Sequence, residues 1–141
     1  MHASGESGSV TALASLFQEP YLFESAVVAN PVTDLVSHLM LDIENRSYSR
    51  SRLEHDIVHY DKLEEFGDVQ NKLFYEMVRT ISPYHMPVVD KEAMHTDLML
   101  CVDDEFVYKY HARKLMCKLR DVYGKDNSFA FYKEYGAKAH T

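Results

Sequence analysis

Short apolar runs that alternate with helix-like segments constrain the fold of this chain more than any other feature. Each run has the length of a buried strand, and each segment between them repeats apolar residues at helical spacing. The expected strands are 24–29, 97–102 and 128–135, and the expected helices are 9–18, 33–40, 69–81 and 107–123. Parallel strands need such crossover helices, so the order predicts an α/β fold with a parallel sheet.

Two of the expected helices carry a clear apolar face. In the first, the face consists of Val69, Leu73, Phe74, Met77 and Val78; in the second, it consists of Tyr108, His111, Leu115, Leu119 and Val122. Pro20 should close the first helix of the chain, and Gly124 should cap the last one. Within the polar stretch 42–62, residues 45–52 are expected to form a loop and residues 52–60 a possible helix.

Composition sets the size and excludes several kinds of partner. The chain has 141 residues, 46% of them apolar, and a net charge of -7. That charge argues against binding to nucleic acid or to an anionic membrane surface. No apolar run approaches the length of a membrane span, and no signal peptide is visible. Cys101 and Cys117 have no framework spacing and are expected to be small buried residues of a reduced, cytoplasmic protein.

The stretch from Gly5 to Ser9, Gly-Glu-Ser-Gly-Ser, opens the first expected helix. A serine between glycines at a strand-to-helix turn is typical of a nucleophile elbow, although the usual G-x-S-x-G pattern has glycine where Ser9 stands. Ser7 is therefore a candidate nucleophile. The backbone N–H of Gly8 is a candidate oxyanion donor, since a helix N-terminus points free N–H groups toward developing negative charge.

An acid and a histidine follow two later strands. Asp104 comes after the strand that ends at Val102, and His140 comes after the last expected strand. The chain order Ser7, Asp104, His140 is that of the α/β-hydrolases, in which the carboxylate orients an imidazole that takes the serine proton. Asp103 is an adjacent alternative for the acid, and either aspartate also suits a helix N-cap.

Several short motifs in this order resemble the carboxyl-terminal catalytic domain of the prolyl oligopeptidase family of serine peptidases. The motifs are the elbow running on to Gln18-Glu19-Pro20-Tyr21-Leu22-Phe23, the strand and turn 26–34, Glu65-Phe66-Gly67-Asp68, Ile81-Ser82-Pro83-Tyr84, Asp104-Glu105-Phe106-Val107 and Ala137-Lys138-Ala139-His140. The resemblance implies a serine-type peptidase that hydrolyses short peptides, with Ser7, Asp104 and His140 as its triad and no cofactor or metal.

The sequence also departs from the family's motifs at the elbow and before the histidine. The elbow is one residue shorter after Ser7 than that of the family and lacks its glycine pair, and Lys138-Ala139 replaces a tighter pair before His140. We therefore expect residues 1–141 to form the C-terminal part of an α/β-hydrolase domain. Its N-terminal half, the strand ahead of the elbow and the family's β-propeller are expected to be absent.

Two other functions remain open. The shortened elbow suggests a non-catalytic relative that serves as an interaction module, and such a protein could self-associate through an uncovered sheet. An unrelated esterase of the same fold would share the triad but not the motifs around Gly67 and Pro83. His55 and His59 have zincin-like spacing, but aspartate follows the first histidine instead of glutamate, so surface histidines are the expected reading.

Overall fold

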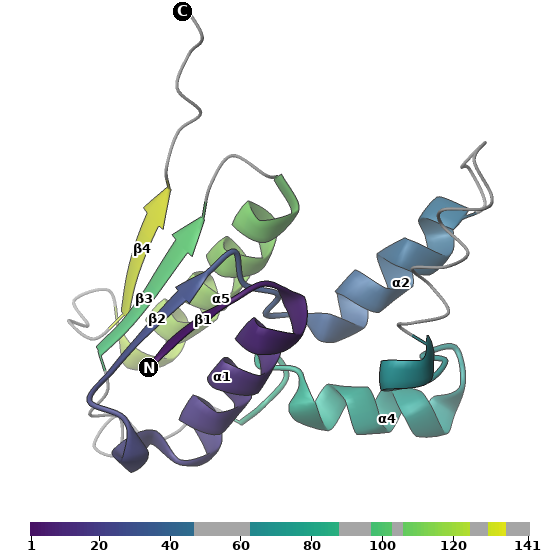
Figure 1. The fold of residues 1–141 in the computed structure, drawn as a ribbon, viewed down its shortest axis with the longest axis horizontal. Coiled ribbons are helices and arrows are strands. Elements are labelled where there is room, and N and C mark those ends of the chain that lie inside the picture. The colour runs from purple at the N-terminus through teal and green to yellow at the C-terminus, as the bar shows by residue number, and fades with distance from the viewer. Residues whose placement is uncertain (47–62, 88–96, 103–105, 125–129, 135–141) are drawn as a thin grey trace, which may run out of the picture.

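A computed structural model describes residues 1–46, 63–87, 97–102, 106–124 and 130–134. Within these residues, four parallel strands form one sheet in the order β1-β2-β3-β4 (Figure 1). The strands are β1 (His2–Ser4), β2 (Ser25–Ala29), β3 (Asp97–Val102) and β4 (Ala130–Glu134). The helices include α1 (Glu6–Gln18), the 3-10 turn η1 (Pro20–Leu22), α2 (Leu35–Arg46), α4 (Lys72–Ile81) and α5 (Phe106–Tyr123), and residues 63–66 form one further helical turn.

The architecture confirms the predicted α/β fold with crossover helices. The three predicted strands and four predicted helices all form, with ends that shift by a few residues. Helix α1 ends just before Pro20, and Gly124 follows α5 with φ of 89° and an N–H bonded to the Arg120 carbonyl at 2.9 Å. The possible helix at 52–60 lies outside the described residues.

The expectation that no strand precedes the elbow is wrong. Strand β1 runs parallel to β2, with His2 opposite Val27 and Ser4 opposite Ala29. The Met1 carbonyl accepts a hydrogen bond from the Val27 N–H at 2.9 Å. A strand of three residues is too short to show an alternating pattern, so only its pairing reveals it.

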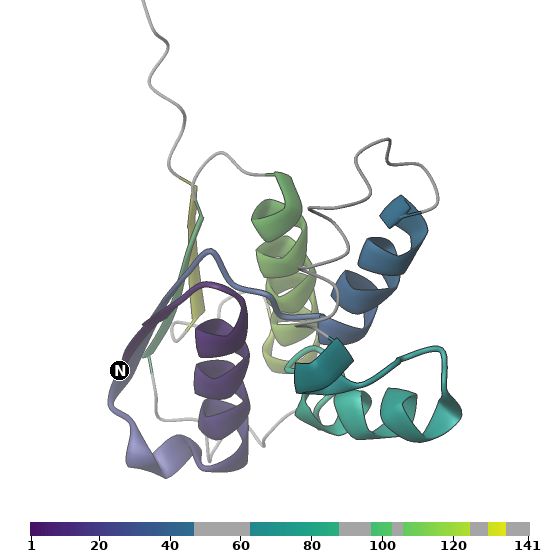
Figure 2. The same cartoon turned by 45° about the vertical axis from the view of Figure 1, so that its right-hand side comes forward.

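Helices α1 and α5 cover the same face of the sheet (Figure 2). Helix α1 contacts β1 and β2, and α5 contacts β3 and β4. The alternation of strand side chains fits this arrangement: Leu98, Leu100 and Val102 of β3 are buried, whereas Met99 between them is 37% exposed. The main core therefore lies between the sheet and these two helices.

A second, smaller core joins α2 and α4 beyond this layer (Figure 2). Its buried residues are Val10, Val32, Leu35, Val36, Leu39, Val69 and Val78. Val10 belongs to α1, so the first helix contributes to both cores.

Three residues predicted for buried helix faces are exposed instead. Leu73 and Met77 of α4 are 65% and 56% exposed, and Val122 of α5 is 55% exposed, while the neighbouring Tyr123 is buried. Helical periodicity identifies an apolar stripe, but it does not say which edge of a wide stripe a neighbouring element covers.

The two cysteines also differ from expectation. Both are free thiols, but Cys101 is only half-buried and Cys117 is exposed on α5. In the described part of the chain, no helix is both long and apolar enough to cross a membrane.

Leu100 and Met99 give a matched test of the covered sheet face. We expect Leu100→Ala to lower the free energy of unfolding by about 3 kcal/mol, because Leu100 is fully buried at the centre of β3. Met99→Ala on the same strand should cost less than about 1 kcal/mol. Urea unfolding followed by circular dichroism measures both; equal losses would contradict the assigned faces.

Candidate functional site

The turn from β1 to α1 is made by a single residue, Gly5. Strand β1 ends at Ser4 and α1 begins at Glu6, and Gly5 between them has φ of 76° and ψ of -176°. This backbone conformation is essentially restricted to glycine. The residue at the sharp point of the strand-to-helix turn therefore carries no side chain.

Ser7 lies inside the first turn of α1, two residues beyond Gly5. Its side chain is exposed, and its Oγ donates a hydrogen bond to Oε1 of Glu65 at 2.8 Å. A hydroxyl has one proton to donate. Ser7 must therefore leave Glu65 before its proton can pass to an imidazole.

Gly8, the predicted oxyanion donor, lies in the first turn of α1. The first hydrogen bond within α1 runs from the Ser9 N–H to the Gly5 carbonyl at 3.1 Å. The N–H of Gly8 precedes it and so belongs to the unsatisfied, positive end of the helix.

Ser9 stands where the usual elbow has glycine, and it has a structural role. Its side chain is fully buried, and its Oγ accepts a hydrogen bond from the Val32 N–H at 2.9 Å. This bond ties the start of α1 to the loop that follows β2.

The other predicted triad members, Asp104 and His140, lie outside the described residues, as does the alternative acid Asp103. The topology nevertheless defines where β3 and β4, the strands that precede Asp104 and His140 in the sequence, come to an end. Because all four strands are parallel, β1, β3 and β4 end at the same edge of the sheet. Sites in open parallel sheets form at this edge.

A hollow of about 240 Å³ adjoins Ser7. Its lining includes Thr11, Ala14 and Gln18 of α1 together with Glu65 and Ile81. Residues 7, 11, 14 and 18 share one helix face. The Ser7 side chain therefore belongs to the flank of α1 that faces 63–66 and the end of α4.

A buried polar cluster around Asp34 was not predicted from the sequence. Asp34 is fully buried at the start of α2, where Oδ1 accepts a hydrogen bond from the Ser37 N–H at 3.0 Å and Oδ2 accepts one from the Ser37 hydroxyl at 2.7 Å. Lys114 of α5 donates a further hydrogen bond to Oδ2. The Thr33-Asp34 pair predicts the helix start, but its lysine partner is 80 residues away in the sequence.

The cluster shifts the ionisation of both partners. Burial by itself would raise the pKa of Asp34, but the hydrogen bonds from Lys114 and Ser37 outweigh it and hold the pKa below 3.8. Burial likewise opposes the charge on Lys114, yet its hydrogen bond to Asp34 and the carboxylate charge raise the pKa above 10.5. Both groups are therefore ionised at neutral pH.

Ser82, His85 and Asp34 also converge, but they do not form a catalytic triad. Nδ1 of His85 lies 3.0 Å from Ser82 Oγ and 3.7 Å from Asp34 Oδ1. A proton relay needs the serine on one ring nitrogen and the acid on the other. Ser82 Oγ is also fully buried and accepts a hydrogen bond from the Leu35 N–H at 3.0 Å, so the group has a structural role.

His111, which the sequence places on the apolar face of its helix, completes the packing of this region. It is fully buried, and its Nδ1 accepts a hydrogen bond from the Asp34 N–H at 3.2 Å. The His111 carbonyl accepts a second one from the Thr33 hydroxyl at 2.6 Å. Among the described residues, no three His, Cys, Asp or Glu side chains gather as metal ligands, and His55 and His59 lie outside that part of the chain.

Comparison with solved structures identifies the fold. A chain of a prolyl endopeptidase matches 96% of this chain with a TM-score of 0.64 and 21% sequence identity. This chain covers 18% of the length of that endopeptidase chain. At this identity the likeness shows a shared α/β fold alone. No family model and no curated protein matches the sequence.

Gly5 and Gly8 provide a matched test of the turn. A Cβ at either position meets nothing within 4 Å, and only Gly5 has a positive φ. We expect Gly5→Ala to lower the free energy of unfolding by about 1 to 3 kcal/mol through backbone strain. Gly8→Ala should leave it unchanged or raise it by up to about 1 kcal/mol, because alanine favours the helix. Equal effects in urea unfolding would contradict the strained turn.

Asp34 should make the protein sensitive to acid. Its pKa is lower in the folded chain than in the unfolded chain, so its contribution to stability is present above about pH 3.8 and is lost as the pH falls through the folded pKa. We expect Asp34→Asn to cost about 3 kcal/mol at pH 7, because Lys114 loses its partner, and to flatten the acid limb of the stability profile.

Glu76→Gln on α4 is the control for this substitution. It makes the same change from carboxylate to amide at an exposed position and should alter stability by less than about 0.5 kcal/mol. Chemical denaturation between pH 2.5 and 7 compares the three proteins. An acid limb that is unchanged in Asp34→Asn would refute the assignment.

Proposed function

We propose that this chain is a non-catalytic domain of the α/β-hydrolase fold, one that acts by binding and not by Ser7-dependent acyl transfer. The observation that carries the proposal is the position of Gly5. The sharp strand-to-helix turn, where such hydrolases present their nucleophile, holds a residue without a side chain.

The location of Ser7 supports the same conclusion. Two residues of helix turn a side chain by roughly 200° about the helix axis. The Ser7 side chain therefore projects from the flank of α1 that faces Glu65, and its hydroxyl proton is directed to that carboxylate. In the serine hydrolases that the sequence resembles, a neutral imidazole takes this proton.

The spacing of the elbow agrees with this geometry. By the standard of the prolyl oligopeptidase family, the elbow is one residue short after Ser7 and lacks the glycine pair. Ser7 therefore does not keep the family's spacing to the residues that follow the nucleophile.

A serine-type peptidase for short peptides is the second candidate. The parallel strand order favours it, since it brings the ends of β1, β3 and β4 to one edge in the order nucleophile, acid, histidine. In this function Ser7 would attack, His140 would act as general base and then acid, and Asp104 would orient His140. The Gly8 N–H would bind the oxyanion. An esterase would use the same groups.

Labelling with a fluorophosphonate probe separates the two functions. We expect wild type to label no more than its heat-denatured sample, and Ser7→Ala to give the same background. A known serine hydrolase in the same reaction shows that the probe is active. Labelling of wild type that disappears in both Ser7→Ala and His140→Ala would overturn the binding function, and comparison of peptide with ester turnover would then distinguish peptidase from esterase.

Self-association through the sheet face opposite α1 and α5 remains part of this proposal. On that face Met99 is 37% exposed and Val27 is half-buried. Half-exposed apolar side chains on a sheet favour association with another surface.

A further inference from the structure

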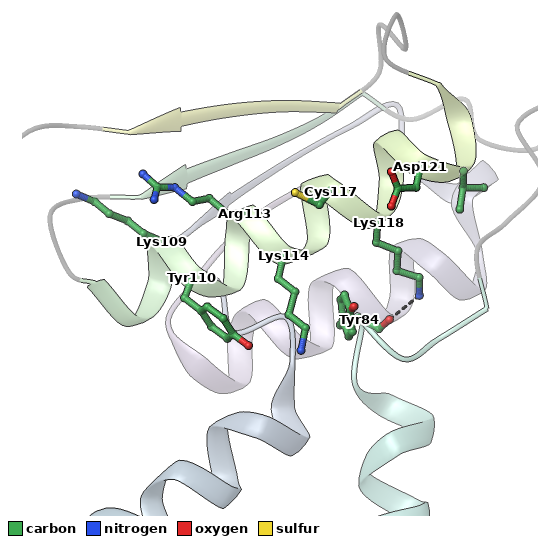
Figure 3. A pocket seen from close by; sticks show the side chains of 9 residues that line it. Tyr84, Lys109, Tyr110, Arg113, Lys114, Cys117, Lys118 and Asp121 are labelled. Atoms are coloured by element: carbon green, nitrogen blue, oxygen red, sulfur yellow. Dashed lines mark hydrogen bonds between the residues drawn. The ribbon is translucent and has the colours of Figure 1, made fainter.

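The outer face of α5 forms a groove of about 560 Å³ together with Tyr84 (Figure 3). Four cationic side chains line it, Lys109, Arg113, Lys114 and Lys118, against one carboxylate, Asp121. The whole chain carries a net charge of -7, whereas cationic side chains outnumber the carboxylate among the residues that line the groove. Its volume lies in the range of small-molecule sites.

Helical spacing places the cations in two adjacent rows. Lys109 and Arg113 lie one turn apart on one row, and Lys114 and Lys118 lie one turn apart on the next. Figure 3 shows Lys109 and Arg113 along one edge, with Lys114 and Lys118 extending toward Tyr84. The positive charge is therefore concentrated along one face of α5.

Neutral partners hold Lys118 at the base of the groove. Its Nζ donates hydrogen bonds to the carbonyl oxygens of Tyr84 at 2.5 Å and Met86 at 2.7 Å. Carbonyl oxygens fix the ammonium group without cancelling its charge. The positive charge of Lys114, by contrast, is compensated by the carboxylate of Asp34. The two lysines are thus preorganised, and Lys118 retains a net positive charge.

Aromatic rings stand beside these ammonium groups. Lys114 Nζ lies 4.2 Å from the ring centre of Tyr84 and 5.7 Å from that of Tyr110, and Lys118 Nζ lies 5.5 Å from the Tyr84 ring. Tyr110 is 44% exposed. A ligand whose charge reaches the lysines would place its own body against these rings.

We propose that the groove binds a small organic anion in which a carboxylate or phosphate group is attached to a flat apolar ring. The anion would contact the lysine and arginine side chains, and the ring would pack against Tyr110 and Val122. The groove shares no lining residue with the hollow beside Ser7, so this inference does not depend on the proposed function.

Amide NMR of the full chain tests the proposal with 2-naphthyl phosphate and 2-naphthoate as probes. We expect saturable shifts in the amides of α5 and Tyr84. Binding of 2-naphthol and of inorganic phosphate should each be at least tenfold weaker, because each lacks one half of the ligand. The probe anion with the higher affinity shows whether the groove prefers a phosphate or a carboxylate group. The affinity should fall as salt rises from 50 to 500 mM.

Two matched double variants locate the site. Lys109→Glu with Arg113→Glu should weaken binding at least tenfold. Lys72→Glu with Arg79→Glu on α4 makes the same change in net charge at exposed positions outside the groove and should leave the affinity within twofold. No saturable shift up to millimolar probe, shifts confined to other elements, or equal losses in both variants would overturn the proposal.

Discussion

The ion pair between the buried Asp34 and the partly exposed Lys114 connects the two layers of the molecule. Asp34 starts α2, whose apolar face forms the second core, and Lys114 belongs to α5, which covers the sheet. The carboxylate also accepts hydrogen bonds from Ser37, so its charge is compensated and its lone pairs are used. A buried charge is tolerated only with such partners. The pair therefore determines where α2 can lie relative to α5.

The position of Tyr84 and the shape of the groove follow from this arrangement. The Tyr84 N–H donates a hydrogen bond to the Thr33 carbonyl at 2.7 Å, next to Asp34. Lys114 reaches Asp34 past the Tyr84 ring, and Lys118 binds the Tyr84 carbonyl. The same lysines that join the layers thus form the base of a cationic groove. A surface that would otherwise be a solvated helix face acquires fixed charges and aromatic walls.

The strands and helices could be predicted from the sequence because their signals are local. The run Asp97–Val102 and the helix Phe106–Tyr123 show the expected apolar patterns, and parallel pairing follows from their alternation. Three features could not be predicted this way. Strand β1 is too short for a pattern, the partner of Asp34 is remote in sequence, and periodicity did not reveal that Leu73 and Met77 remain exposed.

The candidate site depends on which residue occupies the turn between β1 and α1, and a short motif does not define that residue. Gly5-Glu6-Ser7-Gly8 contains a serine between glycines, yet a shift of two residues decides whether that serine lies at the turn or on the flank of the helix. Of these four residues only the two glycines tolerate φ of 76° without strain, and Gly5 is the one that occupies the turn. Ser9 then lies buried against Val32 and holds the register. The same packing that stabilises the start of α1 places Ser7 two residues beyond the turn, where its hydroxyl donates a hydrogen bond to Glu65.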